Sequence, residues 1–133
     1  MKILVLLALI IIMPAAVMAQ RTTLGQSKEE FRATIKPNGG ITLLKGQTSD
    51  TLTMQGGLQI VMYYRRDTCY RSVSLMPMIF KNLMVNKMTE DGYQKVNDTT
   101  WTNRINTVRV VVTDNSDKQH FTVVDTWWDA VKN

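Results

Sequence analysis

The sequence predicts an α+β domain in which two short helices pack on an antiparallel meander sheet. Two segments carry apolar residues at helical spacing, and each ends at a proline or glycine turn signal. The segments that follow each of them alternate between apolar and polar residues with a period of two, as half-buried strands do. Turn residues separate these strands at short intervals, which favours connections between neighbouring antiparallel strands.

An apolar leader precedes this domain. Lys2 supplies a positive charge, Ile3 to Met13 is almost entirely apolar, and Val17-Met18-Ala19 offers the small residues that signal peptidase requires. The apolar run is shorter than the roughly 20 residues that span a membrane. We therefore predict a signal peptide over residues 1-19 and an exported protein, periplasmic or extracellular, that starts at Gln20 and has no stable membrane anchor. An uncleaved signal anchor is the alternative.

The first helix is predicted after a polar lead-in over residues 20-26. Ser27 and Glu30 have the spacing of a capping box, in which each side chain bonds to the backbone amide of the other residue. Phe31 and Ile35 follow as an apolar stripe, and Pro37 ends the helix. The segment 27-133 is thus expected to form one domain.

Four strands are predicted next, in two short and two long segments. The long pair is joined by a turn at Arg65-Arg66-Asp67. The alternation places Cys69, Arg71, Val73 and Leu75 on one face of the last strand. The four segments are Ile41 to Leu44, Thr51 to Met54, Leu58 to Tyr64 and Cys69 to Leu75.

The second half of the chain repeats this order. Pro77 suits a first helical position, and Gly92 suits the helix end. Four strand-like segments follow: Tyr93 to Val96, a short one around Trp101, Thr107 to Thr113 and His120 to Thr126. The element order is that of a tandem α-β-β-β-β repeat with units 27-76 and 77-128, although residue identity between the halves is weak and a coincidence of order is the alternative.

The expected core follows from these periodicities. It consists of Phe31, Ile35, Ile60, Met62, Val73, Ile79, Leu83, Val110, Val112, Phe121 and Val123.

Charge and cysteine content exclude some classes of protein. The net charge is +5 for the 133-residue chain, and charges of both signs are scattered along it, so we expect no nucleic-acid partner. The single cysteine, Cys69, rules out a disulfide within one chain, and we interpret it as a small buried residue. An intermolecular bridge through Cys69 is the alternative.

The layout resembles small secreted α+β proteins of the Bacteroidetes type. The resemblance lies in Ala19-Gln20, in Ser27 to Glu30, and in Asn97-Asp98-Thr99-Thr100-Trp101. The repeated helix-and-meander order also looks like the architecture of the β-lactamase-inhibitor protein. Both resemblances imply an α+β fold, and neither transfers a function, because one fold hosts many functions.

The sequence offers few catalytic or metal-binding groups. One histidine and one cysteine cannot form a zinc or iron–sulfur site, so we expect no metal and no cofactor. Methionines 76, 78, 84 and 88 are ordinary core residues for a helix of this kind. A small hydrolase that uses Cys69 with His120 remains an alternative, as does a structural subunit of an envelope assembly with a long unpaired strand edge.

Tyrosine, arginine and tryptophan provide the best binding candidates, because these residues dominate interaction hot spots. We predict a non-enzymatic exported binding or accessory protein, whose partner is a protein or a glycan in the cell envelope or outside the cell. The oligomeric state is left open. The candidate binding residues are Tyr63, Tyr64, Arg65, Arg66, Tyr70 and Arg71 around one hairpin, and Trp127 and Trp128 near the end of the chain.

Overall fold

The computed structural model describes residues 24–35 and 40–127. The predicted signal peptide, its cleavage site, Pro37 and Trp128 lie outside the described residues. The elements are, in chain order, α2 (Lys28–Thr34), β1 (Ile41–Lys45), β2 (Ser49–Met54), β3 (Leu58–Arg65), β4 (Thr68–Pro77), the 3-10 helix η1 (Met78–Phe80), α3 (Lys81–Glu90), β5 (Gln94–Lys95), β6 (Thr100–Thr102), β7 (Val108–Asp114) and β8 (His120–Trp127).

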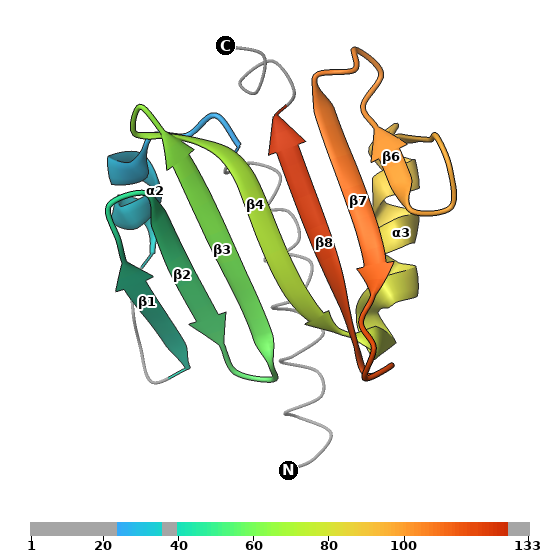
Figure 1. Ribbon diagram of the computed structural model, residues 1–133, viewed down its shortest axis with the longest axis horizontal. Coiled ribbons are helices and arrows are strands. Elements are labelled where there is room, and N and C mark those ends of the chain that lie inside the picture. The colour runs from blue at the N-terminus through green and yellow to red at the C-terminus, as the bar shows by residue number, and fades with distance from the viewer. Residues whose placement is uncertain (1–23, 36–39, 128–133) are drawn as a thin grey trace.

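One eight-stranded sheet organises the domain (Figure 1). Its strand order is β1-β2-β3-β4-β8-β7-β6-β5, and every neighbouring pair is antiparallel. Each half of the chain contributes a helix and a four-stranded meander, and the two meanders join where β4 pairs with β8. The predicted α+β class and the repeated element order are confirmed.

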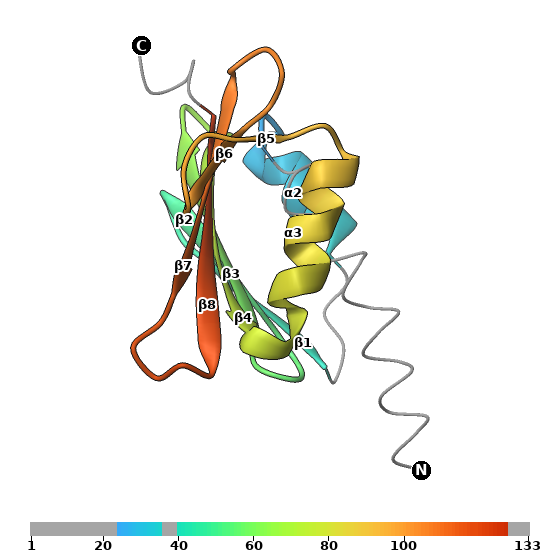
Figure 2. The ribbon, with the colours of Figure 1, turned by 90° about the vertical axis from the view of Figure 1, so that its right-hand side faces the viewer.

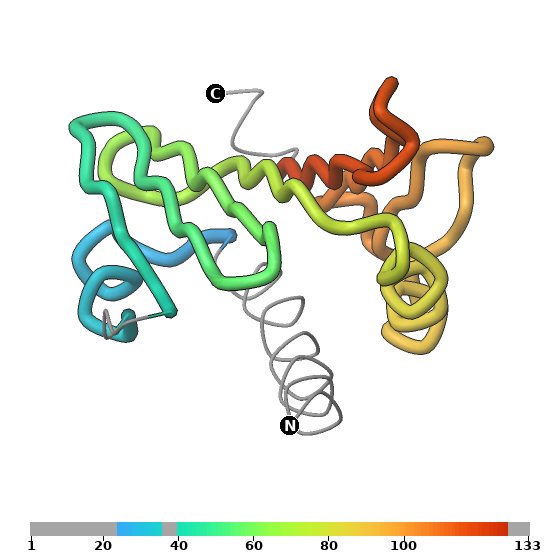
Figure 3. Tube along the Cα trace, turned by 90° about the horizontal axis from the view of Figure 1, so that it is seen from below, coloured from blue at the N-terminus to red at the C-terminus, as the bar shows by residue number. Residues whose placement is uncertain are grey.

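Both helices lie on the same side of this sheet (Figures 2 and 3). The opposite side carries no helix among the residues that the structure describes. We call the first side the helix face and the second the open face. Antiparallel sheets commonly have one packed and one solvated face, so this arrangement alone implies no function.

Helix α2 begins as the sequence predicts. The amide of Glu30 donates to Ser27 Oγ at 3.1 Å, and the amide of Ser27 donates to Glu30 Oε2 at 3.1 Å. Phe31 is the buried residue of this helix. The capping box therefore fixes the start of α2 and turns Phe31 toward the sheet.

Helix α3 begins later than predicted. Pro77 is the last residue of β4, with φ −59° and ψ 140°, and it precedes η1 rather than opening the helix. At the other end Gly92 has φ 86°, and its amide donates to Thr89 O, so the predicted glycine stop is confirmed.

The helix face carries two apolar clusters, one beneath each helix. Most of the predicted core residues are buried in them. The cluster under α2 contains Phe31, Leu52, Ile60, Met62, Tyr64 and Cys69; the cluster under α3 contains Leu58, Met76, Met84, Met88, Trp101, Val110, Val112, Phe121 and Val123.

The core prediction is wrong for Ile79, which is 81% exposed, and for Leu83, which is 48% exposed. Ile79 lies in the 3-10 segment, whose three residues per turn shift it out of phase with α3. The α-helical turns then bury Met84 and Met88 instead. Ile35, also predicted as core, is half-buried at the end of α2 and packs against the cluster there.

A β-bulge in β4 overturns the predicted faces of that strand. Tyr63 pairs with Arg71, whereas Tyr64 pairs with Cys69, so Tyr70 is an extra residue between them. Because a shift of one residue exchanges the two faces of a strand, Cys69 is buried while the residues beyond the bulge reverse their orientation. Val73 consequently lies half-buried on the open face, not in the core.

Candidate binding face

Beyond the bulge, β4 buries polar side chains and exposes apolar ones, which is the reverse of the usual pattern in a sheet. Ser72 and Ser74 face the helices and are fully buried, while Val73 and Leu75 lie half-exposed on the open face. The hydroxyls of both serines have no hydrogen-bond partner among the described residues. A buried hydroxyl without a partner costs about 1–3 kcal/mol, so this arrangement lowers the stability of the isolated domain.

A row of valines crosses the centre of the open face. Val61 of β3 pairs with Val73, Val73 pairs with Val124 of β8, and Val124 pairs with Val111 of β7. Side chains paired in this way lie on the same face about 5 Å apart. The four half-exposed valines thus form a continuous apolar strip over the four central strands.

The bulge places an aromatic and basic group beside this strip. Arg71 lies over the ring of Tyr63 at 5.6 Å, and Arg65 lies over the ring of Tyr70 at 4.8 Å, both measured to the ring centroid. Both arginines are exposed and both tyrosines are half-buried. We call these four residues, which come from β3 and β4, the Tyr–Arg group.

The other candidate binding residues lie elsewhere. Tyr64 is only 7% exposed and belongs to the core under α2, which removes it from the binding surface. Arg66 is an exposed turn residue with φ 50°. Trp127 is half-buried, and its ring lies 3.3 Å from the position that a Cβ of Gly25 would occupy, so it packs against the chain that leads into α2.

The structure does not bring Cys69 and His120 together. His120 pairs with Pro77 at one end of β4, and Cys69 lies near the other end, so roughly 25 Å of strand separates them at about 3.3 Å per residue. His120 Nδ1 instead lies 2.8 Å from Asp117 Oδ2. That hydrogen bond is the first cause of the lowered pKa of the Asp117 carboxyl. A hydrolase would need Cys69 and His120 within hydrogen-bond reach as nucleophile and base, and this geometry keeps them apart.

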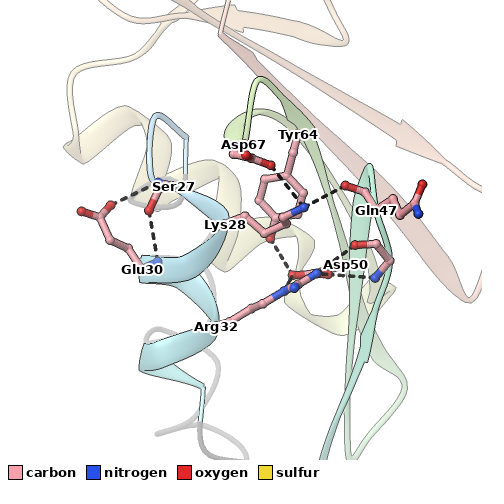
Figure 4. A network of polar contacts seen from close by, with 9 residues as sticks. Ser27, Lys28, Glu30, Arg32, Gln47, Asp50, Tyr64 and Asp67 are labelled. Atoms are coloured by element: carbon pink, nitrogen blue, oxygen red, sulfur yellow. Dashed lines mark hydrogen bonds and ion pairs between the residues drawn. The ribbon is translucent and has the colours of Figure 1, made fainter.

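A buried polar network holds α2 on the sheet (Figure 4). The carboxylate of Asp50 is fully buried and accepts hydrogen bonds from Arg32 Nε at 2.8 Å, Arg32 Nη2 at 2.7 Å, Tyr64 Oη at 2.9 Å and Gly46 N at 3.1 Å. Burial raises the pKa of Asp50, but these hydrogen bonds outweigh it and the pKa is lowered overall. Burial, followed by the bond to Asp50, raises the pKa of Tyr64.

This network is satisfied internally, so we interpret it as structural. Each oxygen of Asp50 has two donors, and the bidentate contact with Arg32 is the strong geometry for a carboxylate. The hydrogen-bonding positions of the Asp50 carboxylate are thus occupied, and none remains for a ligand.

Three further possibilities concern metal binding, a membrane-spanning helix and strand addition at the edges of the sheet. No group of three or more histidine, cysteine or acidic residues there is placed to hold a metal ion. No helix of the described part is long and apolar enough to cross a membrane. The outer edges of the sheet are the five-residue β1 and the two-residue β5, which are short for the strand addition that a structural subunit would use.

The valine row is the part of the candidate site that sequence reasoning missed. Val73 and Val110 have the same residue type, yet the first lies on the open face and the second in the core. The signal in the sequence was Ser72 and Ser74, whose alternation with Val73 and Leu75 allows either face to be the buried one.

No family model, no curated protein and no solved structure matches this chain.

Proposed function

We propose that this protein is a non-enzymatic, exported binding module that recognises its partner through the open face of the sheet. The observation that carries the proposal is the reversed polarity of β4, which turns Val73 and Leu75 outward and buries Ser72 and Ser74. An arrangement that is unfavourable for the isolated domain is understandable if the outward residues are covered by a partner.

The dimensions of the open face suit a protein interface. From β1 to β7 the six strands span about 24 Å at about 4.8 Å per strand, and strands of six or seven residues are about 20 Å long. The projected area is roughly 500 Å², of the same order as the ~800 Å² that each partner contributes to a standard interface. An apolar centre beside tyrosine and arginine is also the usual composition of interface cores.

Export is the second part of the proposal. It rests on the leader pattern of the sequence, from Lys2 to Ala19. A partner would accordingly be sought in the cell envelope or outside the cell.

A matched pair of variants tests the role of the open face. Val73→Gln places a polar side chain in the middle of the valine row, whereas Val96→Gln makes the same change at a loop valine that is 61% exposed. The tagged variants are used to capture partners from the envelope fraction of the producing cells, and thermal melting confirms that both fold. We expect Val73→Gln alone to lose the captured partner. Equal capture by both variants would refute a binding role for the open face.

A further inference from the structure

The charged strand residues of the open face are all of one sign, whereas those of the helix face are of both signs. Asp50 and Asp125 are buried on the helix face, and Asp114 at the end of β7 bonds to Lys81 of α3 at 2.6 Å. None of the described strand residues that point to the open face is an aspartate or glutamate. The open face carries Arg65, Arg71 and Arg109 instead, all of them exposed.

The Tyr–Arg group is suited to the recognition of carboxylates. A guanidinium stacked on an aromatic ring keeps its N–H groups directed along its edges, where a carboxylate accepts two parallel hydrogen bonds. Arg71 is held in this way over Tyr63. The stacking also restricts the arginine side chain before binding, which lowers the entropy lost on association.

The position of this group relative to the valines defines the pattern that a partner must match. Tyr63 is two residues from Val61 along β3, and Arg71 is two residues from Val73 along β4. The backbone positions of Tyr63 and Arg71 therefore lie about 7 Å along the strands from the apolar strip, toward the Arg66–Asp67 turn.

We infer that the partner is a protein whose surface combines an apolar centre with carboxylates on the side that meets the Tyr–Arg group. This inference rests on the proposed function. An anionic polysaccharide supplies carboxylates, but the apolar C–H faces of its rings are small and bordered by hydroxyl groups, so they do not cover a continuous row of four valines. A second copy of this chain supplies valines, but its open face has no described acidic side chain to meet Arg71, so like charges would face each other.

Site-specific photo-crosslinking tests this inference in the cells that produce the protein. Gln59 is an exposed open-face residue of β3 paired with Leu75, and Asn86 is an exposed residue of α3. p-Benzoylphenylalanine is introduced at one position or the other, and the attached peptide is identified by mass spectrometry. We expect a protein crosslink from position 59 and none from position 86, with several acidic residues in the attached peptide.

Charge variants then test the chemistry of the contact. Arg71→Gln should lower the yield of the crosslink from position 59 about tenfold, as expected for an arginine hot spot worth about 1.4 kcal/mol. Arg104→Gln removes the same charge from an exposed loop arginine that lies against Gly92, and it should leave the yield unchanged. Raising the salt concentration in the envelope fraction should weaken the wild-type crosslink, because charge-steered association is screened by salt.

The outcomes separate the two proposals. If positions 59 and 86 give the same products or none, the open face is not the binding surface and the proposed function fails. If position 59 gives a specific protein product whose yield is the same in Arg71→Gln as in Arg104→Gln, binding by the open face stands and the acidic partner is refuted. A crosslinked dimer of this chain, or a glycan product, would also refute the acidic protein partner.

Discussion

Removal of the Arg32 guanidinium tests whether the Asp50 network holds α2 on the sheet. Arg32→Met keeps an aliphatic side chain of similar length in the helix but deletes two of the four donors of a fully buried carboxylate. Asp50 would retain only the hydroxyl of Tyr64 and the amide of Gly46. A buried charge is thereby left without its counter-charge.

The expected loss of stability follows from that geometry. Breaking a buried ion pair by removing one partner costs about 3–5 kcal/mol. The Arg32 side chain is 25% exposed, so solvent already screens part of the pair and we expect about 2–4 kcal/mol. In a domain of this size each kcal/mol shifts the melting temperature by about 4–8 °C, which predicts a shift of at least about 8 °C.

Lys28→Met is the matched control on the same helix. Lys28 Nζ lies 3.2 Å from Asp67 Oδ1 and donates to Gln47 O at 2.9 Å, but Asp67 is largely exposed, and ion pairs with an exposed carboxylate contribute about 0–1 kcal/mol. Thermal and denaturant unfolding of both variants measure the difference. If Arg32→Met unfolds at the same temperature as Lys28→Met, the reasoning about the buried carboxylate is refuted.

The pH dependence gives an independent check of the same network. The pKa of Asp50 in the folded protein is lowered from its usual value of 3.8, so the stabilisation is complete above that value and is lost as the pH falls through the lowered pKa. In Arg32→Met only the hydrogen bonds from Tyr64 and Gly46 still offset the burial of Asp50, so protonation of the carboxyl relieves part of the penalty. The difference in unfolding free energy between wild type and Arg32→Met should therefore be largest near pH 7 and shrink below about pH 4.

Three further predictions concern the core, the cysteine and the leader. Phe121→Ala should destabilise the domain by about 3–5 kcal/mol, because the ring is fully buried. Leu83→Ala should cost about 1 kcal/mol or less, because Leu83 is half-exposed. Denaturant unfolding measures both losses, and equal losses would contradict the described packing. Cys69→Ser should lower stability by about 1–3 kcal/mol and leave partner capture intact, and lost capture by a folded variant would give Cys69 a functional role. Mass spectrometry of exported material should find Gln20 at the amino terminus, and an intact segment 1-19 would refute cleavage.

The elements could be predicted from the sequence because their boundaries are marked by local chemistry. The capping box at Ser27, the turn at Arg66-Asp67 and the glycine stop at Gly92 all act within a few residues. The class of fold follows once two such helices and two sets of alternating strands are recognised. Such signals do not indicate that β4 and β8 become neighbours, since that pairing joins residues about 50 positions apart.

The faces of β4 could not be predicted, because a bulge is a backbone irregularity with no reliable mark in the sequence. One extra residue, Tyr70, reverses the orientation of Val73 and Leu75. The candidate site was therefore predicted only in part. The Tyr–Arg group was identified from composition, whereas Tyr64 is buried, Val73 was interpreted as core and the other valines of the row were not singled out.

The Asp50 network was missed for a related reason. Its partners lie 18 and 14 residues away along the chain, and no local pattern connects them. The available signal was the position of Asp50 two residues before Leu52, which places both on the same face of β2. An acidic residue at a core-facing strand position implies a buried cationic partner, and Arg32 on the neighbouring helix provides it.

The separation of the core into two clusters has a consequence for folding cooperativity. Each helix has its own apolar cluster, and the strands that join the halves, β4 and β8, are paired through residues that include Ser72 and Asp125 as well as apolar ones. Leu58 and Met76 of the first half belong to the cluster under α3, so apolar packing as well as backbone hydrogen bonds connects the halves. Because each helix still covers a different cluster, native-state hydrogen exchange should show two protected units that open with different free energies.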